Sequence, residues 1–374
     1  MPPLVIDLRR ADDHRDVVHR AVQTLAEGGL VVFPTETVYG LGASARSVAG
    51  VEKIFEAKGR SLQAPLALAI KSAEEALDYV PQMGRIAERL ARRCWPGPIT
   101  LVVETGEAGG LVEQLPEAVR QVVLPSGSVG LRVPAHDTTL AVLQMLAGPI
   151  ALTSVNLSGE PAAVTAAQAV ESLGDHLALV LDDGACRYGQ PSTVVRATAD
   201  GFSCLREGVV NQSALDRLSS MIILLVCTGN TCRSPMAEVM MRQLVAEKLG
   251  CAVEEIDQHG VLVASAGIAA APGCGPSAEA VVVMKEKSLC LANHASQPLT
   301  EKLVRHADVI LTMTGGHRQA ILRRWPDAAS RTFTLRPDAG DINDPIGGPI
   351  SVYRVCAEQV ESALRERINE LELK

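Results

Sequence analysis

Residues 221–235 read MIILLVCTGNTCRSP, an apolar run followed by a short polar loop and a proline. The run Ile222–Val226 is continuously hydrophobic, which is typical of a strand buried on both faces of a parallel sheet. Pro235 suits the first turn of a helix, because the N–H that proline lacks has no partner there in any case. The stretch therefore predicts a strand, a loop and a helix, the unit from which doubly wound α/β domains are built.

The loop also carries a Cys-x5-Arg spacing, from Cys227 to Arg233. Backbone N–H groups in such a loop point inward and cradle a phosphate, helped by the N-terminus of the following helix. Arg233 can hold two phosphoryl oxygens at once, and its charge favours the Cys227 thiolate, which is the nucleophilic form. The other residues predicted for this phosphate loop are Thr228, Gly229, Asn230, Thr231, Cys232 and Ser234.

The rest of the C-terminal part continues the same alternation of strands and helices. Strand candidates are 262–265, 309–312 and 332–335, and helices are predicted over 235–249 and 351–371. We expect a doubly wound parallel-sheet domain over 221–374, preceded by a linker over 209–220 that contains a polar stretch able to form a short helix.

The N-terminal part, residues 1–208, predicts a separate α/β domain with a mixed sheet. Helical periodicity covers 12–27, 47–57, 73–79 and 86–94. Strand candidates are 30–33, 66–70, 99–103, 129–133, 150–153, 179–181 and 193–196. An internal methionine at the start of the second domain suggests a gene fusion.

Composition limits the classes of protein to which the chain can belong. A length of 374 residues predicts two or three domains, and 47% hydrophobic with 21% charged residues describes packed domains. Residues 1–220 hold 19 basic and 25 acidic side chains and the remainder holds 16 and 18, so neither part has the basic excess of a dedicated nucleic-acid binder. We expect no DNA and no membrane as partners.

The termini and cysteines indicate a cytoplasmic protein. The first twenty residues mix acidic, basic and apolar side chains, unlike a signal peptide. Nine cysteines are an odd number in a large chain, which argues against a secretory disulfide framework. Because they lack Cys-x-x-Cys pairs and a nearby set of histidines, we predict no metal site built from protein ligands.

The C-terminal loop resembles that of the low-molecular-weight protein phosphatase family, and the resemblance extends over nearly all of 221–374. The segments 265–267, 294–297, 311–313 and 341–345 support it. The resemblance implies that Asp344 protonates the leaving group, that Asn230 organises the loop and that Ser234 hydrogen-bonds the Cys227 sulfur. Cys232 is expected either to form a protective disulfide with Cys227 or simply to pack.

The phosphatase substrate has two candidates. Tyrosine phosphatases of the family usually have an aliphatic residue where Thr231 stands and aromatic residues after Asp-Pro, whereas this chain has Ile346-Gly347-Gly348. A phenyl ring would lose stacking partners worth ~0.5–1.5 kcal/mol each. Together with Thr228, these residues resemble the protein-arginine-phosphatase branch, so phosphoarginine is favoured and phosphotyrosine is the alternative.

The N-terminal domain carries an ordered set of small polar motifs. Residues 34–42 read PTETVYGLG after a buried strand, and glycines and threonines there suit close approach to a small polar ligand. Lys58-Gly59-Arg60, 95–100, 130–134, 154–159, 192–195 and 205–208 follow. The set resembles the YrdC-like threonylcarbamoyl-AMP synthase family over about residues 5–208.

That resemblance implies a reaction in which threonine and bicarbonate form a carbamate that attacks the α-phosphate of ATP and releases pyrophosphate. Such a site gathers and orients anions and needs no covalent nucleophile. ATP with Mg²⁺ is the implied substrate. The residues that match the family's ATP-contacting positions are Lys58, Arg60, Asn156 and Arg206, and those that match its threonine site are Thr35, Arg132, Ser154 and Ser192.

The chain departs from that family at Ala64, Ala69, Val164 and Arg196, where relatives often carry Asn, His, a hydroxyl and Asp. A degenerate domain or a bare RNA-binding module are therefore alternatives for the N-terminal half. We expect a bifunctional cytoplasmic enzyme that supplies tRNA threonylcarbamoyladenosine formation, contacts the tRNA-modification machinery and dephosphorylates a protein. The rival class is a regulatory protein whose N-terminal domain only binds nucleotide or RNA and controls a phosphotyrosine phosphatase.

Overall fold

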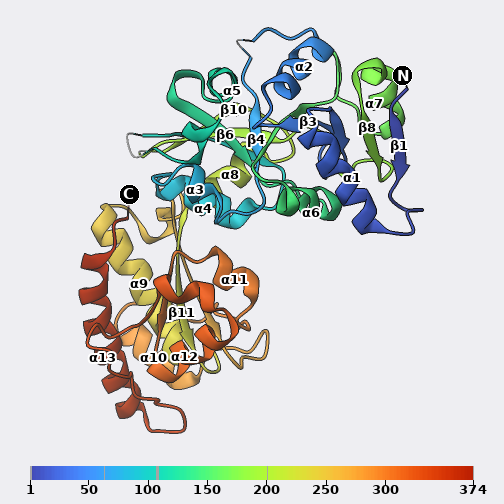
Figure 1. The fold of residues 1–374 in the computed structure, drawn as a ribbon. Helices are drawn as coiled ribbons and strands as arrows, with labels where there is room; N and C mark the ends of the chain where they lie inside the picture. The colour runs from blue at the N-terminus through green and yellow to red at the C-terminus, as the bar shows by residue number, and fades with distance from the viewer. Residues whose placement is uncertain (1, 63, 107–108, 200, 374) are drawn as a thin grey trace. The chain divides into compact units, whose positions relative to one another are not determined.

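The computed structural model describes residues 2–62, 64–106, 109–199 and 201–373 of the chain (Figure 1). The chain divides into two compact units, residues 1–218 and 219–374, and each has its own hydrophobic core. Both units are α/β structures, and the fold class predicted from the sequence is confirmed.

The first unit is built on one mixed sheet with ten strands in the described residues. Their order across the sheet is β1-β8-β2-β3-β7-β4-β6-β5-β9-β10. The strands are β1 (Leu4–Asp7), β2 (Val31–Phe33), β3 (Gly40–Ser44), β4 (Ala67–Ala69), β5 (Ile99–Glu104), β6 (Ser128–Arg132), β7 (Ile150–Ser154), β8 (Leu179–Asp182), β9 (Thr193–Ala197) and β10 (Phe202–Arg206). The helices are α1 (His14–Ala26), α2 (Val48–Lys58), α3 (Ala76–Tyr79), α4 (Arg85–Cys94), α5 (Glu117–Val123), α6 (Asp137–Met145), α7 (Ala166–Leu173) and α8 (Gln212–Ser219).

The two faces of this sheet are covered differently along its width. Side chains alternate across a strand, so that in β7 Ala151 joins one core while Ile150 and Leu152 join another, formed with α1 and α6. The face that bears Leu152 continues over β4, β6, β5 and β9, where its residues line a cleft. The site therefore lies on a stretch of sheet face that stays open beyond the α1–α6 layer.

The segment PTETVYGLG contains a strand, β3, which the sequence analysis did not predict. Gly40 and Gly42 both lie in β3, with ordinary extended backbone rather than positive φ. A Cβ on Gly40 would lie 2.8 Å from Leu152 Cδ1, and one on Gly42 would lie 2.7 Å from Ile150 Cγ2. Close packing of β3 against β7 thus requires these two glycines, and Gly40 in addition lines a cleft of this unit.

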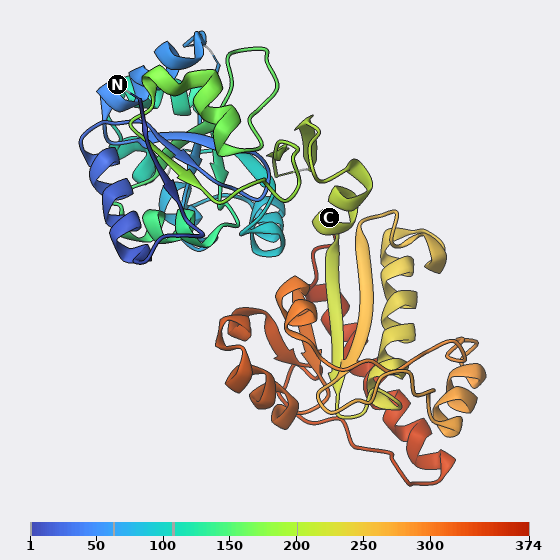
Figure 2. The same cartoon turned by 90° about the vertical axis from the view of Figure 1, so that its right-hand side faces the viewer.

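The second unit has a parallel sheet with four strands in the described residues, in the order β12-β11-β13-β14. The strands are β11 (Met221–Cys227), β12 (Val261–Gly267), β13 (Val309–Thr312) and β14 (Thr332–Thr334). The helices are α9 (Arg233–Leu249), α10 (Ala278–Glu286), α11 (Glu301–His306), α12 (Gly315–Arg324) and α13 (Ile350–Glu370). Figure 2 shows β11 and β12 as two long neighbouring strands of this unit, and β12 forms one edge of the sheet.

Both faces of β11 are buried, as its continuous apolar run predicts. Ile223 and Leu225 join a core with residues of α9, α10 and α13, whereas Leu224 and Val226 join a core with residues of α11 and α12. Helices on both faces of a parallel sheet define a doubly wound domain, and the loop that follows Cys227 lies at the carboxyl end of a central strand, where such folds bind ligands.

Between the two units, the segment predicted as a linker contains α8. Its Leu215 is fully buried in the core of the first unit, so most of this segment is an integral part of that unit. Only Ser220 separates α8 from β11. Among the described residues, no helix combines the length and the apolar character that crossing a membrane requires.

Candidate functional sites

The cleft of the first unit has a volume of about 530 Å³. Register partners on five adjacent strands lie side by side along its floor, and these are Leu152, Ala67, Gly130, Val102 and Arg196. A Cβ added to Gly130 would lie 3.5 Å from Ala67 and 3.6 Å from Thr100, which are ordinary van der Waals distances. The floor is therefore mostly apolar and flat, and a side chain at Gly130 would take space from a ligand rather than from the fold.

Six of the eight residues predicted to bind ATP or threonine line this cleft, namely Thr35, Arg60, Arg132, Ser154, Ser192 and Arg206. They come from six separate segments of the chain. The fold thus brings three guanidinium groups and three hydroxyl groups into one cavity, which is a donor-rich surface suited to an anionic ligand.

The three arginines are held by neutral neighbours as well as by one carboxylate. Arg60 donates to Thr153 Oγ1 at 2.9 Å, and Arg206 donates to the Ser192 carbonyl at 2.8 Å. Burial, followed by the positive charges of Arg132 and Arg60, lowers the pKa of Arg206, and burial also lowers the pKa of Arg60. Crowded and desolvated cations of this kind are relieved when an anion binds among them.

Arg132 is paired with Glu36, a carboxylate that the sequence analysis did not predict. Arg132 Nη2 donates to Glu36 Oε1 at 2.9 Å and to Thr37 Oγ1 at 2.8 Å, and the Ala135 N–H donates to Glu36 Oε2. Both side chains are less than a tenth exposed. The buried Nε of Arg132 has no protein partner among the described residues, and other atoms of the Arg132 side chain line the cleft.

Lys58 and Asn156 lie behind the cleft rather than on its surface. Lys58 Nζ donates to the Ser154 carbonyl, the Asn156 carbonyl and Asn156 Oδ1 at 2.5, 2.8 and 3.0 Å. Ser154 Oγ donates to Asn156 Oδ1 at 2.6 Å. In this geometry Lys58 uses its three N–H groups to hold the Ser154–Asn156 turn, and Ser154 is what reaches the cleft.

The positions where the chain departs from the resembled family are spread over the unit. Arg196 lines the cleft, whereas Ala69 is fully buried in the core beside Arg132 on the neighbouring strand. Ala64 lies in the loop after α2, and Val164 precedes α7. Of the four departures, only Arg196 thus belongs to the lining of the cleft.

In the second unit, the loop after β11 folds around the sulfur of Cys227. The Asn230 N–H donates to Cys227 Sγ at 3.2 Å, and Ser234 Oγ lies 2.9 Å from the same sulfur. Cys227 is 3% exposed and lies at the bottom of the loop. Two polar groups, one from the loop backbone and one from the start of α9, therefore lie within hydrogen-bonding distance of the Cys227 sulfur.

Asn230 holds this loop in shape from its centre. It has a φ of 55°, a left-handed conformation that Asn tolerates better than most residues. Its side-chain amide donates to Ser234 Oγ at 3.0 Å and to Ser265 Oγ at 2.8 Å, and its Oδ1 accepts from the Gln297 N–H at 2.8 Å. The predicted organising position of Asn230 therefore has a geometric basis.

Three further side chains support the loop and were predicted only as parts of motif segments or not at all. Ser265 Oγ donates to Glu238 Oε2 at 2.5 Å, and His294 Nε2 lies 2.8 Å from the Asn230 carbonyl. Ser265 and His294 stand in segments that supported the family resemblance, whereas Glu238 is an isolated acidic residue on α9 with no sequence signal of its own.

Arg233 and Asp344 lie together above the loop. Arg233 Nη2 donates to Asp344 Oδ2, and Arg233 Nη1 donates to the Ile342 carbonyl at 3.3 Å. Arg233 is 5% exposed, whereas the Asp344 side chain is 43% exposed. A carboxylate at the open side of a phosphate loop can deliver a proton to a departing group without blocking access to the sulfur.

Cys232 and Thr231 are the loop residues for which the sequence predicted a disulfide or packing role and a role in substrate choice. Cys232 Sγ packs 3.6 Å from the hydroxyl of Tyr353, and both Cys227 and Cys232 are free thiols. Thr231 is half-buried, with Oγ1 3.6 Å from Cys232 Sγ. Ile346 is 69% exposed, and the residues directly after Pro345 are Ile346, Gly347 and Gly348, none of which is aromatic.

Thr228, the residue after the cysteine, is exposed and contacts a histidine that the sequence analysis missed. Its Oγ1 lies 2.9 Å from His317 Nε2, on the first turn of α12. His317 is 6% exposed, and its Nδ1 is buried without a partner among the described residues. Burial, followed by the charge of Arg233, lowers the pKa of His317. A single histidine between two glycines and an arginine carries no motif by which sequence could have identified it.

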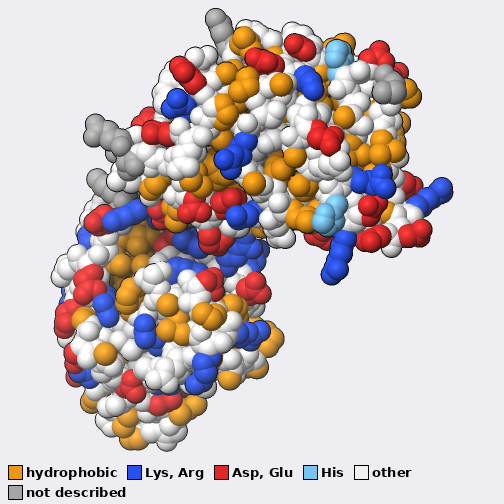
Figure 3. All heavy atoms as spheres, in the orientation of Figure 1, with side chains coloured by type: hydrophobic (Ala, Val, Ile, Leu, Met, Phe, Trp, Pro, Cys, Tyr) orange, Lys and Arg blue, Asp and Glu red, His pale blue; other side chains and the backbone are white. Residues whose placement is uncertain are grey.

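Neither unit presents a metal centre within the part of the chain that the structure describes, since no three His, Cys, Asp or Glu side chains cluster there in a way that could hold an ion. Figure 3 shows acidic and basic side chains interspersed over the visible face of the N-terminal unit.

Comparison with known proteins assigns each unit to a separate group of relatives. Residues 23–208 match the Sua5/YciO/YrdC family, described as telomere recombination, and residues 222–374 match the family described as low molecular weight phosphotyrosine protein phosphatase. The protein-arginine-phosphatase of Geobacillus stearothermophilus is 42% identical over 146 residues, which are 38% of this chain and 90% of that relative.

The N-terminal relatives are synthases. The threonylcarbamoyl-AMP synthase of Mus musculus is 34% identical over 224 residues, which are 58% of this chain and 75% of that protein. The chain spans about half the length of the curated synthases from Pyrococcus abyssi and Bacillus subtilis that it matches. A solved structure of Pyrococcus abyssi Sua5 complexed with L-threonine is 27% identical with a TM-score of 0.52, covering 70% of this chain and 92% of that one.

Proposed function

Because the chain belongs to the Sua5/YciO/YrdC family through residues 23–208 and to the low-molecular-weight phosphatase family through residues 222–374, we propose that it is a bifunctional enzyme. The first unit makes threonylcarbamoyl-AMP from L-threonine, bicarbonate and ATP and releases pyrophosphate. The second is a cysteine-dependent protein phosphatase. The product of the first is used for tRNA threonylcarbamoyladenosine formation, through transient contact with the tRNA-modification machinery.

The synthase proposal is carried by the convergence of Arg60, Arg132 and Arg206 on one cleft. The carbamate formed from threonine and bicarbonate is an anion that must attack an anionic phosphate, and fixed positive charge is the means of bringing the two together. Arg60 and Arg206 are assigned to the phosphates of ATP. Arg132 is assigned to the carboxylate of threonine, because its Nε still lacks a partner.

The hydroxyl groups of Thr35, Ser154 and Ser192 are assigned to threonine, and the apolar floor around Gly130 and Val102 to the nucleoside. Lys58 and Asn156 do not contact the substrates in this assignment, and instead hold Ser154 in position through hydrogen bonds. Among the described residues, the lining of the cleft contains no carboxylate, so we assign Mg²⁺ to the Mg·ATP substrate rather than to a site on the protein.

For the phosphatase, the observation that carries the proposal is the Asn230 N–H and the Ser234 hydroxyl directed at Cys227 Sγ, with Asp344 beside Arg233. Cys227 attacks phosphorus, while loop N–H groups and Arg233 stabilise the phosphoryl oxygens and Asp344 protonates the leaving atom. Water then hydrolyses the thiophosphate, so that no metal or other cofactor takes part.

We favour phosphoarginine as the substrate, with phosphotyrosine as the alternative. The exposed Ile346 and the half-buried Thr231 leave the mouth of the loop without an aromatic wall from the segment after Pro345. The similarity to a protein-arginine-phosphatase over 90% of its length supports the same choice. We propose that both activities are cytoplasmic, as expected from an odd number of cysteines spread over a large chain.

One assay decides between this proposal and a regulatory protein that merely binds nucleotide or RNA through its first unit. Pyrophosphate release from ATP is measured with and without threonine and bicarbonate. Pyrophosphate release that requires both threonine and bicarbonate supports a synthase. Pyrophosphate release that does not depend on one of them contradicts it. Phosphatase activity is measured on the same preparation with phosphoarginine and phosphotyrosine.

A further inference from the structure

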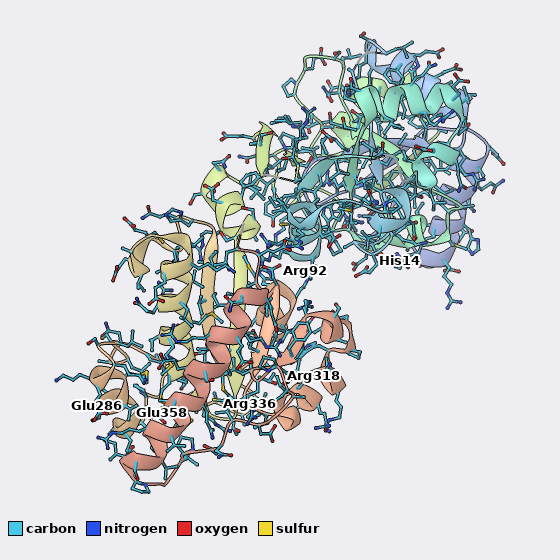
Figure 4. The ribbon with its side chains drawn as sticks, turned by 90° about the vertical axis from the view of Figure 1, so that its left-hand side faces the viewer. His14, Arg92, Glu286, Arg318, Arg336 and Glu358 are labelled. Atoms are coloured by element: carbon cyan, nitrogen blue, oxygen red, sulfur yellow. The ribbon has the colours of Figure 1, made fainter. Side chains whose placement is uncertain are left out.

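His317 lies at a junction between the phosphate loop and the segment that carries the acid. Its Nε2 is 2.9 Å from Thr228 Oγ1, while two residues earlier the Gly315 N–H donates to Asp341 Oδ1 at 2.8 Å. The Ile342 N–H in turn donates to the Met313 carbonyl. The start of α12 therefore touches both segments of the proposed phosphatase site. Arg318, the next residue on α12, and Arg336, in the segment leading to Asp344, are labelled in Figure 4.

The unpartnered Nδ1 decides which tautomer of His317 is present. If Nδ1 carried the proton, a buried N–H would lose its hydrogen bond to water and gain nothing in return, whereas a bare ring nitrogen is tolerated more easily. The doubly protonated ring would have the same orphan donor and would also face the positive charge of Arg233, with Asp341 and Asp344 as the acidic groups around it. The neutral ring with its proton on Nε2 is the state that this geometry favours.

That tautomer fixes the role of the Thr228 hydroxyl. Nε2–H donates to Thr228 Oγ1, so the hydroxyl proton and the second lone pair of Thr228 are directed away from His317. No other side chain hydrogen-bonds this hydroxyl in the described part of the chain. Thr228 is exposed, whereas Cys227 below it is 3% exposed. Because the phosphoryl group must reach Cys227, the exposed Thr228 side chain faces the leaving group at the mouth of the loop.

We propose that His317 is a positioning residue that holds the Thr228 hydroxyl as a polar wall at the mouth of the phosphate loop, where it selects a polar leaving group such as guanidinium over a phenyl ring. The inference rests on the proposed phosphatase activity of the second unit. Thr228 in the loop and His317 on α12 therefore determine leaving-group specificity together, and neither does so alone.

The test is a double-mutant cycle in the full chain, with Thr228→Val, His317→Leu and the double variant. The measured quantity is the ratio of kcat/KM for phosphoarginine to kcat/KM for phosphotyrosine. Each single variant is expected to lower this ratio about tenfold, within the range of a one-group change in a pocket, and the double variant is expected to lower it no further. Additive losses, or an unchanged ratio in Thr228→Val, would overturn the proposal.

Two further variants separate positioning from mere folding. His317→Gln keeps an N–H donor near the position of Nε2 and is expected to restore most of the ratio that His317→Leu loses. Gln319→Ala, on the exposed side of α12, is the matched control and is expected to leave the ratio unchanged. Should His317→Leu fail to fold, Thr228→Val and His317→Gln still decide the outcome, since loss in the first and retention in the second are both required.

An activity-independent measurement tests the tautomer. A long-range ¹H–¹⁵N spectrum of the wild-type chain, with His317→Gln used for assignment, is expected to show a neutral ring protonated at Nε2 near neutral pH. A ring protonated at Nδ1, or a doubly protonated ring, would overturn the inference. The proposed function fails separately, if wild type hydrolyses neither substrate, and the proposed substrate fails if wild type prefers phosphotyrosine.

Discussion

The two proposed phosphate-binding sites are built in opposite ways. In the second unit, one contiguous loop of eight residues, 227–234, forms the proposed site and holds the Cys227 sulfur, the proposed nucleophile. In the first, arginines and hydroxyls from several strands and loops meet over an open sheet face. In a site built on one loop, a single substitution at the nucleophile should abolish activity. In a site assembled from distant segments, each single substitution should lower activity only in part. Each prediction below tests that contrast.

The largest effect is expected from Cys227→Ser. A serine hydroxyl is not ionised near neutral pH and cannot replace the thiolate, so phosphatase turnover should fall by ~10⁴-fold or more. Synthase activity of the same variant should equal that of wild type. The exposed Cys290→Ser is the matched control and should leave both activities intact. Residual phosphatase activity above a hundredth of wild type would place the nucleophile elsewhere.

Asp344→Ala should follow, with losses that depend on the leaving group. General acid catalysis contributes ~10²–10⁴-fold, and it matters most where the leaving atom is a poor one. The variant is therefore expected to lose most activity toward alkyl phosphates and least toward activated aryl phosphates, as measured by phosphoenzyme formation. Equal losses across the series would show that Asp344 only holds Arg233.

In the first unit, Arg60→Ala should lower pyrophosphate release by ~10²–10³-fold, the scale of losing one charged contact to a transition state. Lys58→Ala should lower it less and should raise the KM for threonine as well, because Lys58 acts through Ser154. Phosphatase activity should be unchanged in both, and Lys71→Ala on the surface serves as control. Unchanged synthase rates in both single variants would refute the assignment of the cleft.

Thr231→Ile should change specificity rather than abolish turnover. The substitution removes a hydroxyl and adds a methylene unit that crowds a guanidinium but can pack against a phenyl ring. A change of this size is worth ~10–200-fold in discrimination. We expect kcat/KM for phosphoarginine to fall while that for phosphotyrosine stays constant or rises. A ratio that does not move, or a wild type that already prefers phosphotyrosine, favours the tyrosine-phosphatase alternative.

The smallest effect concerns pH. Burial, followed by the charge of Arg60, lowers the pKa of Lys58 from 10.5 to about 8. Between these values the unfolded chain binds the proton and the folded chain does not, so the free energy of unfolding should rise with pH. Synthase activity should instead fall by a few-fold above about pH 8, since a neutral amine has two N–H groups for three acceptors. Lys58→Met should lack both dependences.

The arrangement of the second candidate site is easier to predict from sequence than that of the first, because its residues are close together in the chain. Cys227, Asn230, Ser234 and Arg233 lie within eight residues, and a strand–loop–helix pattern is sufficient to place them around one sulfur. His317, by contrast, reaches Thr228 across 89 positions of sequence, and only the packing of α12 onto the sheet brings the two together.

In the first unit, sequence indicates which residues belong to the site, but not which of them line the cleft and which lie behind it. A resemblance places Lys58 and Arg60 together, yet their side chains diverge, one toward the turn behind the cleft and the other toward Thr153 on its wall. Gly40 and Gly42 fit a ligand-binding loop by composition, and only the side chains of Leu152 and Ile150 opposite them reveal a strand. Buried pairs such as Glu36 with Arg132 leave no periodic signal in the sequence.

Between the end of α8 and the start of β11 lies a single residue, Ser220, and it is 5% exposed. Proteolytic nicking concentrates at exposed, poorly ordered segments, and this junction offers none in the stretch 212–227. Because both proposed enzymes lie on one chain, they are made together. A cell that carries this chain cannot adjust the dosage of one activity without changing the other, and their stoichiometry stays fixed at one to one through every change in expression.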